Sequence, residues 1–177
     1  MDTTRRHFLQ AGLAGAAVLA IAGGIAWFRR RVDAAALAPS LGEEARDVVR
    51  AIVPSLLAGA LPPGAERATA IDETVAGVDR AIAGLLPAAR AELAQLFALL
   101  TLGAGRRAFA GVTTAWRDAT RDEVDAFLTS WQASAWALKR TAYDALHQLV
   151  LAAWYANPRS WPAIGYPGPP VVSPLHT

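Results

Sequence analysis

Apolar residues recur at helical spacing along most of the chain between residues 40 and 157. Val49, Ile52, Val53 and Leu56 fall at i, i+3, i+4 and i+7, which places them on one face of a helix. Comparable stripes predict five helices, at about 43–60, 66–85, 87–102, 121–131 and 135–156. No stretch alternates apolar and polar residues as a half-buried strand does. The sequence therefore predicts an all-α domain of about five helices packed around one core.

Local signals mark where two of these helices begin. Ser40 stands three residues before Glu43, and Thr120 stands three residues before Glu123. This is the capping-box spacing, in which the hydroxyl and the carboxylate each accept from a backbone N–H at the helix start. Pro54 lies inside the first helix and should kink or break it, because it lacks the N–H that the helix needs there.

Other signals mark where helices end. Gly103-Ala104-Gly105 predicts the end of the third helix, and Asn157-Pro158 predicts the end of the fifth. The fifth helix has the longest apolar stripe, formed by Leu138, Ala142, Leu146, Leu149 and Ala153.

The last 20 residues have a different character. Residues 158–177 contain six Pro and two Gly, so they cannot form a regular helix and are predicted to be extended. Trp161, Ile164 and Tyr166 interrupt this segment. Fully burying one large apolar side chain is worth about 1.5–3 kcal/mol. These three side chains are therefore predicted to need a surface, either on this chain or on another.

The first 31 residues also stand apart. Arg5 and Arg6 precede His7, Phe8 and Leu9, and the run from Leu9 to Phe28 carries no charge. A basic head, twin Arg, Phe-Leu and an apolar body together predict a twin-arginine export signal, which moves proteins that have already folded.

An ordinary membrane-anchor helix is the alternative for this segment. Residues 9–28 would span about 30 Å as a helix, which matches a bilayer core. Cleavage after Ala22 and retention as an anchor both remain open. The predicted organisation is a signal or anchor at 1–31, a linker at 32–39, a helical domain at 40–157 and a Pro-rich aromatic tail at 158–177, with the body in the periplasm.

Composition narrows the classes of function. The net charge is +2, but the first 31 residues hold five Arg against one Asp, so the remainder is −2. The basic balance therefore belongs to the targeting segment and gives no support for nucleic-acid binding. The absence of Cys excludes disulfides, thiolate-bound iron–sulfur clusters and Cys-x-x-Cys-His haem attachment.

No catalytic constellation emerges from the residues. His147 lies three residues after Asp144 in the fifth helix, a pair that favours a structural role over catalysis or metal binding. Asp122, Glu123 and Asp125 are acidic residues at a predicted helix start, where negative charge is stabilising in any case. The six Trp of the chain are expected in the core or at an interface.

The tail sequence resembles a known family signature. Residues 154–169 read Trp-Tyr-Ala-Asn-Pro-Arg-Ser-Trp-Pro-Ala-Ile-Gly-Tyr-Pro-Gly-Pro. This resembles the C-terminal signature of the gluconate 2-dehydrogenase subunit 3 family, in which a helix ends at an Asn-Pro-like turn and Trp-x-x-Ile-Gly-Tyr-Pro-Gly follows. Ile52-Val53-Pro54, Pro63-Gly64-Ala65 and Ile71-Asp72 are similar to the family's earlier landmarks. Ser55 and Leu56 depart from it, since acidic residues are expected there.

The resemblance implies a non-catalytic γ-type subunit of a periplasmic dehydrogenase. Such a subunit binds, stabilises and co-exports a flavin-dependent dehydrogenase of the glucose–methanol–choline class through the twin-arginine translocase. FAD would reside in the partner, this chain would hold no cofactor or metal, and a cytochrome c subunit could join. The export signal would be carried by Arg5, Arg6, Phe8 and Leu9. The implied partner-binding residues are Trp154, Tyr155, Asn157, Pro158, Trp161, Ile164, Gly165, Tyr166, Pro167 and Gly168.

Two other hypotheses compete with this one. The first is a stand-alone, membrane-tethered helical protein of the periplasm that binds an apolar ligand or a lipid, for which a large closed apolar pocket would be evidence. The second is an enzyme, for which the sequence offers no set of acid, base, nucleophile or metal ligands.

Overall fold

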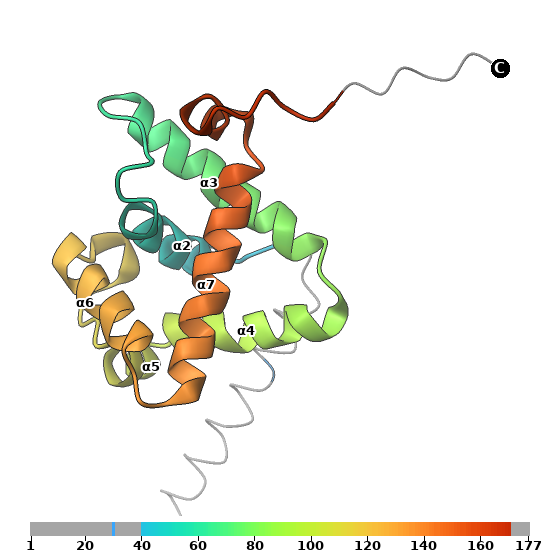
Figure 1. The fold of residues 1–177 in the computed structure, drawn as a ribbon. Helices are drawn as coiled ribbons and strands as arrows, with labels where there is room; N and C mark the ends of the chain where they lie inside the picture. Colours follow the sequence, from blue (N-terminus) through green and yellow to red (C-terminus); the bar gives the residue numbers. More distant parts are fainter. Residues whose placement is uncertain (1–29, 31–39, 171–177) are drawn as a thin grey trace, which may run out of the picture.

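The computed structural model of the chain describes Arg30 and residues 40–170, and in these residues it is all-helical (Figure 1). Five helices have 12 residues or more: α2 (Glu43–Leu56), α3 (Glu66–Ala83), α4 (Pro87–Thr101), α6 (Arg121–Gln132) and α7 (Ala137–Tyr155). The shorter elements are α5 (Gly103–Gly105), the π-helical η1 (Arg106–Ala110), and the 3₁₀-helical η2 (Trp116–Asp118), η3 (Pro158–Ser160) and η4 (Pro162–Ile164). The prediction of an all-α fold is confirmed.

The predicted export signal lies outside the described residues. This holds for Arg5, Arg6, Phe8 and Leu9, for the apolar run up to Phe28, and for the linker at 32–39. Among the helices that the structure describes, none combines the length and the apolar character needed to cross a membrane.

Helix α2 forms the centre of the core. Val49, Ile52 and Val53 are almost completely buried, as the helical periodicity predicts, whereas Leu56 is half-buried. Val48, outside the predicted stripe, is buried as well. Helices α3, α4, α6 and α7 all contact α2, and α7 in turn packs along α3 and α6. In Figure 1, α7 crosses the body from α4 to the end of α3 at which the tail leaves. Pro54 does not break α2, because it falls in the last turn, two residues before the helix ends at Leu56.

Aromatic side chains fix the irregular segment between α4 and α6. The ring of Phe127 lies edge-on to Trp116 at 5.5 Å and to Trp131 at 4.8 Å between ring centroids. The indole N–H of Trp116 donates to the Leu100 carbonyl at 2.7 Å, and that of Trp131 donates to the Phe109 carbonyl at 2.8 Å. These Trp residues therefore belong to the core, where each satisfies its own polar group.

Helices α3 and α7 approach each other closely at Gly77. A Cβ atom at Gly77 would lie 3.1 Å from the Cβ of Ala153 and 3.3 Å from the Ala153 carbonyl oxygen. Two small residues at the crossing thus let the two backbones come together, and a larger side chain on either helix would push them apart.

One capping box is confirmed and the other is wrong. Thr120 accepts from the Glu123 N–H at 3.3 Å, and Glu123 accepts from the Thr120 N–H at 3.2 Å. Glu123 also accepts from Thr113 and Thr114, and the bond from the Thr120 N–H together with these bonds lowers the pKa of Glu123 to about 2. Ser40 does not cap α2, whose N-cap is Gly42 without a side-chain hydrogen bond. The physical reason is that Asp79 of α3 accepts from the Leu41 N–H at 2.6 Å and holds the chain extended there.

Several predicted boundaries are also corrected. α2 ends at Leu56 rather than near residue 60, and α3 ends at Ala83. The chain leaves the helical conformation at Leu102, but Gly103–Gly105 starts a new short helix instead of a loop. Leu138 is 78% exposed and does not belong to the inward stripe of α7, because the helix begins only at Ala137 and its first turn lies at the edge of the body.

We expect the α3–α7 crossing to be sensitive to volume. Gly77→Val should lower the free energy of unfolding by about 1–3 kcal/mol, because the branched side chain overpacks the contact with Ala153. Ala76→Val is the matched control, since Ala76 is an exposed neighbour on the same helix and reports only the helix propensity of Val. Urea unfolding followed by circular dichroism measures both variants. Equal stability of the two variants would contradict the close crossing.

Candidate functional site

The tail folds back onto the body instead of extending away from it. Pro158–Ser160 and Pro162–Ile164 form two consecutive 3₁₀ turns, so the predicted extended conformation is wrong for this part of the tail. Proline at the first position of a helical turn has a suitable φ and needs no hydrogen-bond partner for its nitrogen. The prolines that exclude a regular α-helix thus favour these short turns.

Asn157 joins the end of α7 to this folded tail. Its side-chain oxygen accepts from the Arg159 N–H at 3.0 Å, which caps the first 3₁₀ turn. Its amide nitrogen donates to Oε2 of Glu73 at 2.8 Å. Ser160, which is buried, donates its hydroxyl to the Asn157 carbonyl at 2.9 Å. The predicted end of the last helix at Asn157-Pro158 is confirmed, and Asn157 also binds the tail to α3.

An ion pair between Arg159 and Glu73 completes this attachment. Nε and Nη2 of Arg159 donate to the two carboxylate oxygens of Glu73 at 2.8 and 3.0 Å, a bidentate geometry. Glu66, about two helix turns earlier on α3, lies 3.3 Å from Nη1. The hydrogen bonds from Arg159 and Asn157 lower the pKa of Glu73 to about 2. Residues 86 positions apart in sequence are thereby brought together.

Trp161 holds the second half of the tail. Its indole N–H donates to the Tyr155 carbonyl at 2.9 Å, and its ring meets Tyr166 edge-on at 5.3 Å. The Tyr166 N–H donates to the Trp161 carbonyl at 3.0 Å. Gly168 has a φ of +101°, and a Cβ atom there would lie 3.1 Å from the Trp161 ring. Trp161 is half-buried and stabilises the tail from within, so it is not a freely exposed anchor.

The remaining predicted residues divide into exposed and buried groups. Tyr155, Ile164 and Tyr166 are large and exposed, with Ile164 at 55%, and we call these three side chains the tail patch. Gly165 and Pro167 continue the turn between Ile164 and Gly168, and Pro158 is exposed in the first 3₁₀ turn. Trp154 is only 3% exposed and lies in the hydrophobic core, so it is not placed to touch a partner.

Sequence reasoning missed the acidic half of this site. Glu73 and Glu66 lie on α3 and have no charge partner that local spacing would reveal. A weak signal exists, since Arg159 is the basic residue inside the tail signature and a buried or half-buried Arg requires a carboxylate. The pairing itself depends on how α3 and α7 cross, which the sequence pattern does not contain.

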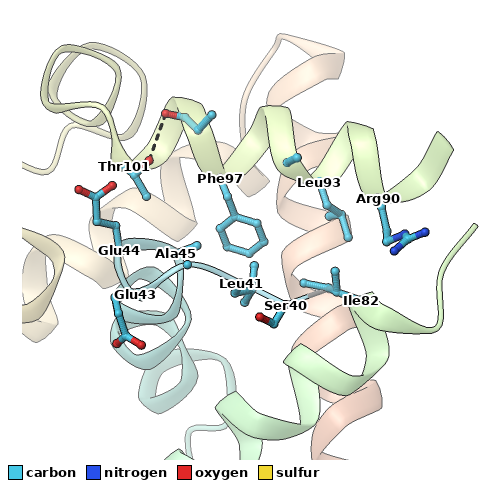
Figure 2. A pocket seen from close by; sticks show the side chains of 13 residues that line it. Ser40, Leu41, Glu43, Glu44, Ala45, Ile82, Arg90, Leu93, Phe97 and Thr101 are labelled. Atoms are coloured by element: carbon cyan, nitrogen blue, oxygen red, sulfur yellow. Dashed lines mark hydrogen bonds between the residues drawn. The ribbon is translucent and has the colours of Figure 1, made fainter. Parts of the chain in front are cut away.

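A second feature is a pocket between α2, α3 and α4 (Figure 2). It has a volume of about 590 Å³ and is lined largely by apolar side chains, among them Leu41, Ile82, Leu93 and Phe97. In Figure 2, Arg90 lies at one end of the α4 wall, and Glu43 and Glu44 lie toward the other.

The polar groups around this pocket differ in their partners. Nε of Arg90 is buried and has no hydrogen-bond partner among the described residues, whereas Glu43 is paired with Arg46 at 2.7 Å. An apolar cavity with a buried guanidinium nitrogen at one end suits an amphipathic molecule that carries an anionic group.

The side chain of His147 contacts a neighbour on its own helix. It stacks on Tyr143 with ring centroids 5.6 Å apart. Within the described residues, no three metal-ligating side chains lie close enough together to hold an ion.

Comparison with known proteins does not identify a family for this chain. No family model matches the chain, and neither a curated protein nor a solved structure is significantly similar to it. The function must therefore be argued from the site itself and from the residues of the tail that carry the resemblance.

We predict that the attachment of the tail depends on the charge of Glu73. A carboxylate with a lowered pKa stabilises the bound tail above the pKa of the unfolded state, near 4.5, and this contribution is lost as the pH falls toward about 2. Glu73→Gln should loosen residues 159–166 at neutral pH and abolish that acid transition. Backbone ¹⁵N relaxation of Ile164 and Gly165 measures the order of the tail.

Glu66→Gln is the matched control for this experiment, because Glu66 is more exposed and makes a single longer contact with Arg159. It should change the order of the tail much less. A Glu73→Gln tail that is as ordered as the wild-type tail at neutral pH would contradict the role given to this ion pair.

Proposed function

We propose that this chain is a non-catalytic small subunit that binds, stabilises and co-exports a flavin-dependent dehydrogenase of the glucose–methanol–choline class. One observation carries the proposal: the tail patch of Tyr155, Ile164 and Tyr166 is exposed to solvent although its backbone is fixed to the body. The tail signature supplies the class of partner, and the patch supplies the surface that would meet it.

Pre-organisation makes the tail patch suitable for binding. A free tail would lose conformational entropy on docking, at about 0.5–1.5 kcal/mol for each side chain that becomes immobilised. Here the Arg159–Glu73 pair, the Asn157 cap and the packing of Trp161 against Tyr166 fix the tail beforehand. Two tyrosines and an isoleucine on such a platform are the kind of anchors that dominate protein interfaces.

The same arrangement explains what each part of the signature does. Asn157 and Trp161 hold the tail in shape, Gly165 and Gly168 adopt positive φ values of 68° and 101° that allow its turns, and Ile164 and Tyr166 remain available to a partner. A motif that combines a rigid frame with exposed anchors is expected of a docking element rather than of a disordered end.

Export is the second part of the proposal. Arg5, Arg6, Phe8 and Leu9 would direct the chain to the twin-arginine translocase, which accepts folded cargo. The dehydrogenase would fold and bind FAD in the cytoplasm, dock on the tail patch, and cross as a passenger to the periplasm. A cytochrome c subunit could then join the complex, and an uncleaved signal would anchor it to the inner membrane.

The pocket supports a second candidate function. Its largely apolar walls and the buried Nε of Arg90, which has no hydrogen-bond partner among the described residues, favour a stand-alone, membrane-tethered periplasmic protein that binds an amphipathic anion such as a lipid or fatty acid. The pocket is partly open to solvent and not a closed cavity. The two candidates differ in one observable property, because the subunit co-purifies with a yellow flavoprotein and the ligand binder is isolated alone and colourless.

The tail patch can be tested by substitution. Ile164→Ala combined with Tyr155→Ala should weaken the complex with the dehydrogenase by at least tenfold, because two exposed anchors are lost while the ring of Tyr166 stays packed against Trp161. Leu86→Ala is the control, since Leu86 is 78% exposed directly before α4 and outside the tail patch. Affinity purification from the native host, with circular dichroism to confirm helix content, measures the effect. Equal recovery of the partner with both variants would exclude the tail patch as the docking site.

The export step has its own test. Arg5→Lys combined with Arg6→Lys should leave both this chain and its dehydrogenase partner in the cytoplasm, because the translocase reads the twin arginines. Immunoblots of cytoplasmic and periplasmic fractions show where each protein resides. A partner that still reaches the periplasm in normal amounts would rule out passenger export.

A further inference from the structure

The end of the molecule opposite the tail exposes a second group of large apolar side chains. Trp136 is 65% exposed and Leu138 is 78% exposed at the start of α7, and Phe109 of η1 is also exposed. Together with the tail patch and Leu86, they make up the exposed large hydrophobic side chains of the described residues. We call Phe109, Trp136 and Leu138 the α7-start patch.

Hydrogen bonds bring the two segments of this patch together. The indole N–H of Trp131, at the end of α6, donates to the carbonyl of Phe109 itself at 2.8 Å. Ser134 then orders the turn into α7, since its hydroxyl accepts from the Trp136 N–H at 3.2 Å and its carbonyl accepts from Arg140 at 2.5 Å. Figure 1 shows α5, which leads into η1, beside the turn between α6 and α7. The exposed side chains are thus held in place by an ordered backbone.

Basic residues are close in sequence to these apolar side chains, and the two segments that carry the patch contain no acidic residue up to Asp144. Residues 103–112 contain Arg106 and Arg107, and residues 129–143 contain Lys139 and Arg140, without any Asp or Glu in either segment. The ammonium of Lys139 lies 5.8 Å from the centre of the Trp136 ring. Residues 40–170 hold 12 Lys and Arg against 13 Asp and Glu, so this local concentration of positive charge is not a consequence of overall composition.

We propose that the α7-start patch binds the surface of an anionic phospholipid bilayer. Trp and Leu side chains would enter the interfacial region, and Arg107, Lys139 and Arg140 would meet the lipid phosphates. Trp prefers the membrane–water interface, and clustered Lys and Arg next to apolar side chains are the features with which peripheral proteins bind anionic lipids. This proposal does not depend on the identity of the dehydrogenase.

Geometry lets the two patches act at the same time. They lie at opposite ends of α7, whose 19 residues correspond to about 28 Å of helix. A partner on the tail patch would therefore leave the α7-start patch free to contact the membrane. The positive charge favours an anionic bilayer over a protein partner as the occupant of the α7-start patch. A protein interface of ordinary composition does not require several cations around its apolar centre.

Vesicle binding of the full-length protein tests the proposal. The probes are vesicles of phosphatidylcholine alone and of phosphatidylcholine mixed with phosphatidylglycerol. Trp136→Ala combined with Leu138→Ala, and separately Arg107→Gln combined with Lys139→Gln, should each lower the affinity for the anionic vesicles by about tenfold or more. Leu86→Ala matches Leu138 in exposure, and Arg67→Gln combined with Arg80→Gln removes the same charge from α3. Both controls should bind as the wild type does.

A local readout separates this patch from the apolar N-terminal run, which has its own affinity for lipid. Anionic vesicles that contain brominated phosphatidylcholine should quench the fluorescence of the wild type more than that of Trp136→Phe, because Trp136 would lie in the bilayer interface. Equal quenching, or unchanged vesicle affinity of the patch variants, would overturn the proposal. Loss of the dehydrogenase from the Trp136→Ala, Leu138→Ala variant would instead identify the patch as a protein interface and would also overturn it.

Discussion

The close contact between Gly77 and Ala153 determines where the tail can bind. Glu73 lies one helix turn before Gly77 on α3, and Asn157 lies one turn after Ala153 at the end of α7. When the two helices touch at the small residues, Glu73 comes within 2.8 Å of the Asn157 amide and of the Arg159 guanidinium. The register of one helix crossing therefore sets the position of the tail, and with it the position of Tyr155, Ile164 and Tyr166.

This arrangement connects stability to the proposed function. Helix α7 is packed along α3 and α6 for most of its length, and its two ends carry the exposed apolar side chains. At one end, the charged frame of Glu73 and Arg159 fixes a surface suited to a protein partner. At the other end, aromatic and basic side chains are suited to lipid. A rigid helix between them would let a small subunit hold a large dehydrogenase at a membrane, which agrees with an export signal that can also act as an anchor.

The helical periodicity was sufficient to predict the fold class and most of the core. Val49, Ile52, Val53 and Leu146 are buried as predicted, because the spacing of apolar residues along an amphipathic helix shows which face is buried. The capping box at Thr120 was also predictable, since both partners lie within one turn. The capping box predicted at Ser40 was wrong, because Asp79 of α3 accepts a hydrogen bond from the Leu41 N–H and holds this stretch of backbone in another conformation. The prediction that Leu138 is buried was wrong, because the periodicity does not show which turns of a helix extend beyond the body.

The candidate site was predictable only in part, for a related reason. The tail signature identified Asn157, Trp161, Ile164 and Tyr166, but their division into framework and exposed anchors follows from contacts over long sequence distances. Glu73 is 86 residues from Arg159, and no local pattern could join them. Trp154 was expected at the interface and lies in the core, because the last turn of α7 is still covered by its neighbours.

The central claim is that this chain exists in a complex with a flavoprotein. The most direct measurement is the purification of tagged full-length protein from the periplasm and membranes of its native host under gentle conditions, followed by an absorbance spectrum and the mass of each chain. The account predicts a co-purifying chain of dehydrogenase size in equimolar amount, with the spectrum of bound flavin. A single colourless chain of 18.6 kDa or less, without a partner in either fraction, would contradict it.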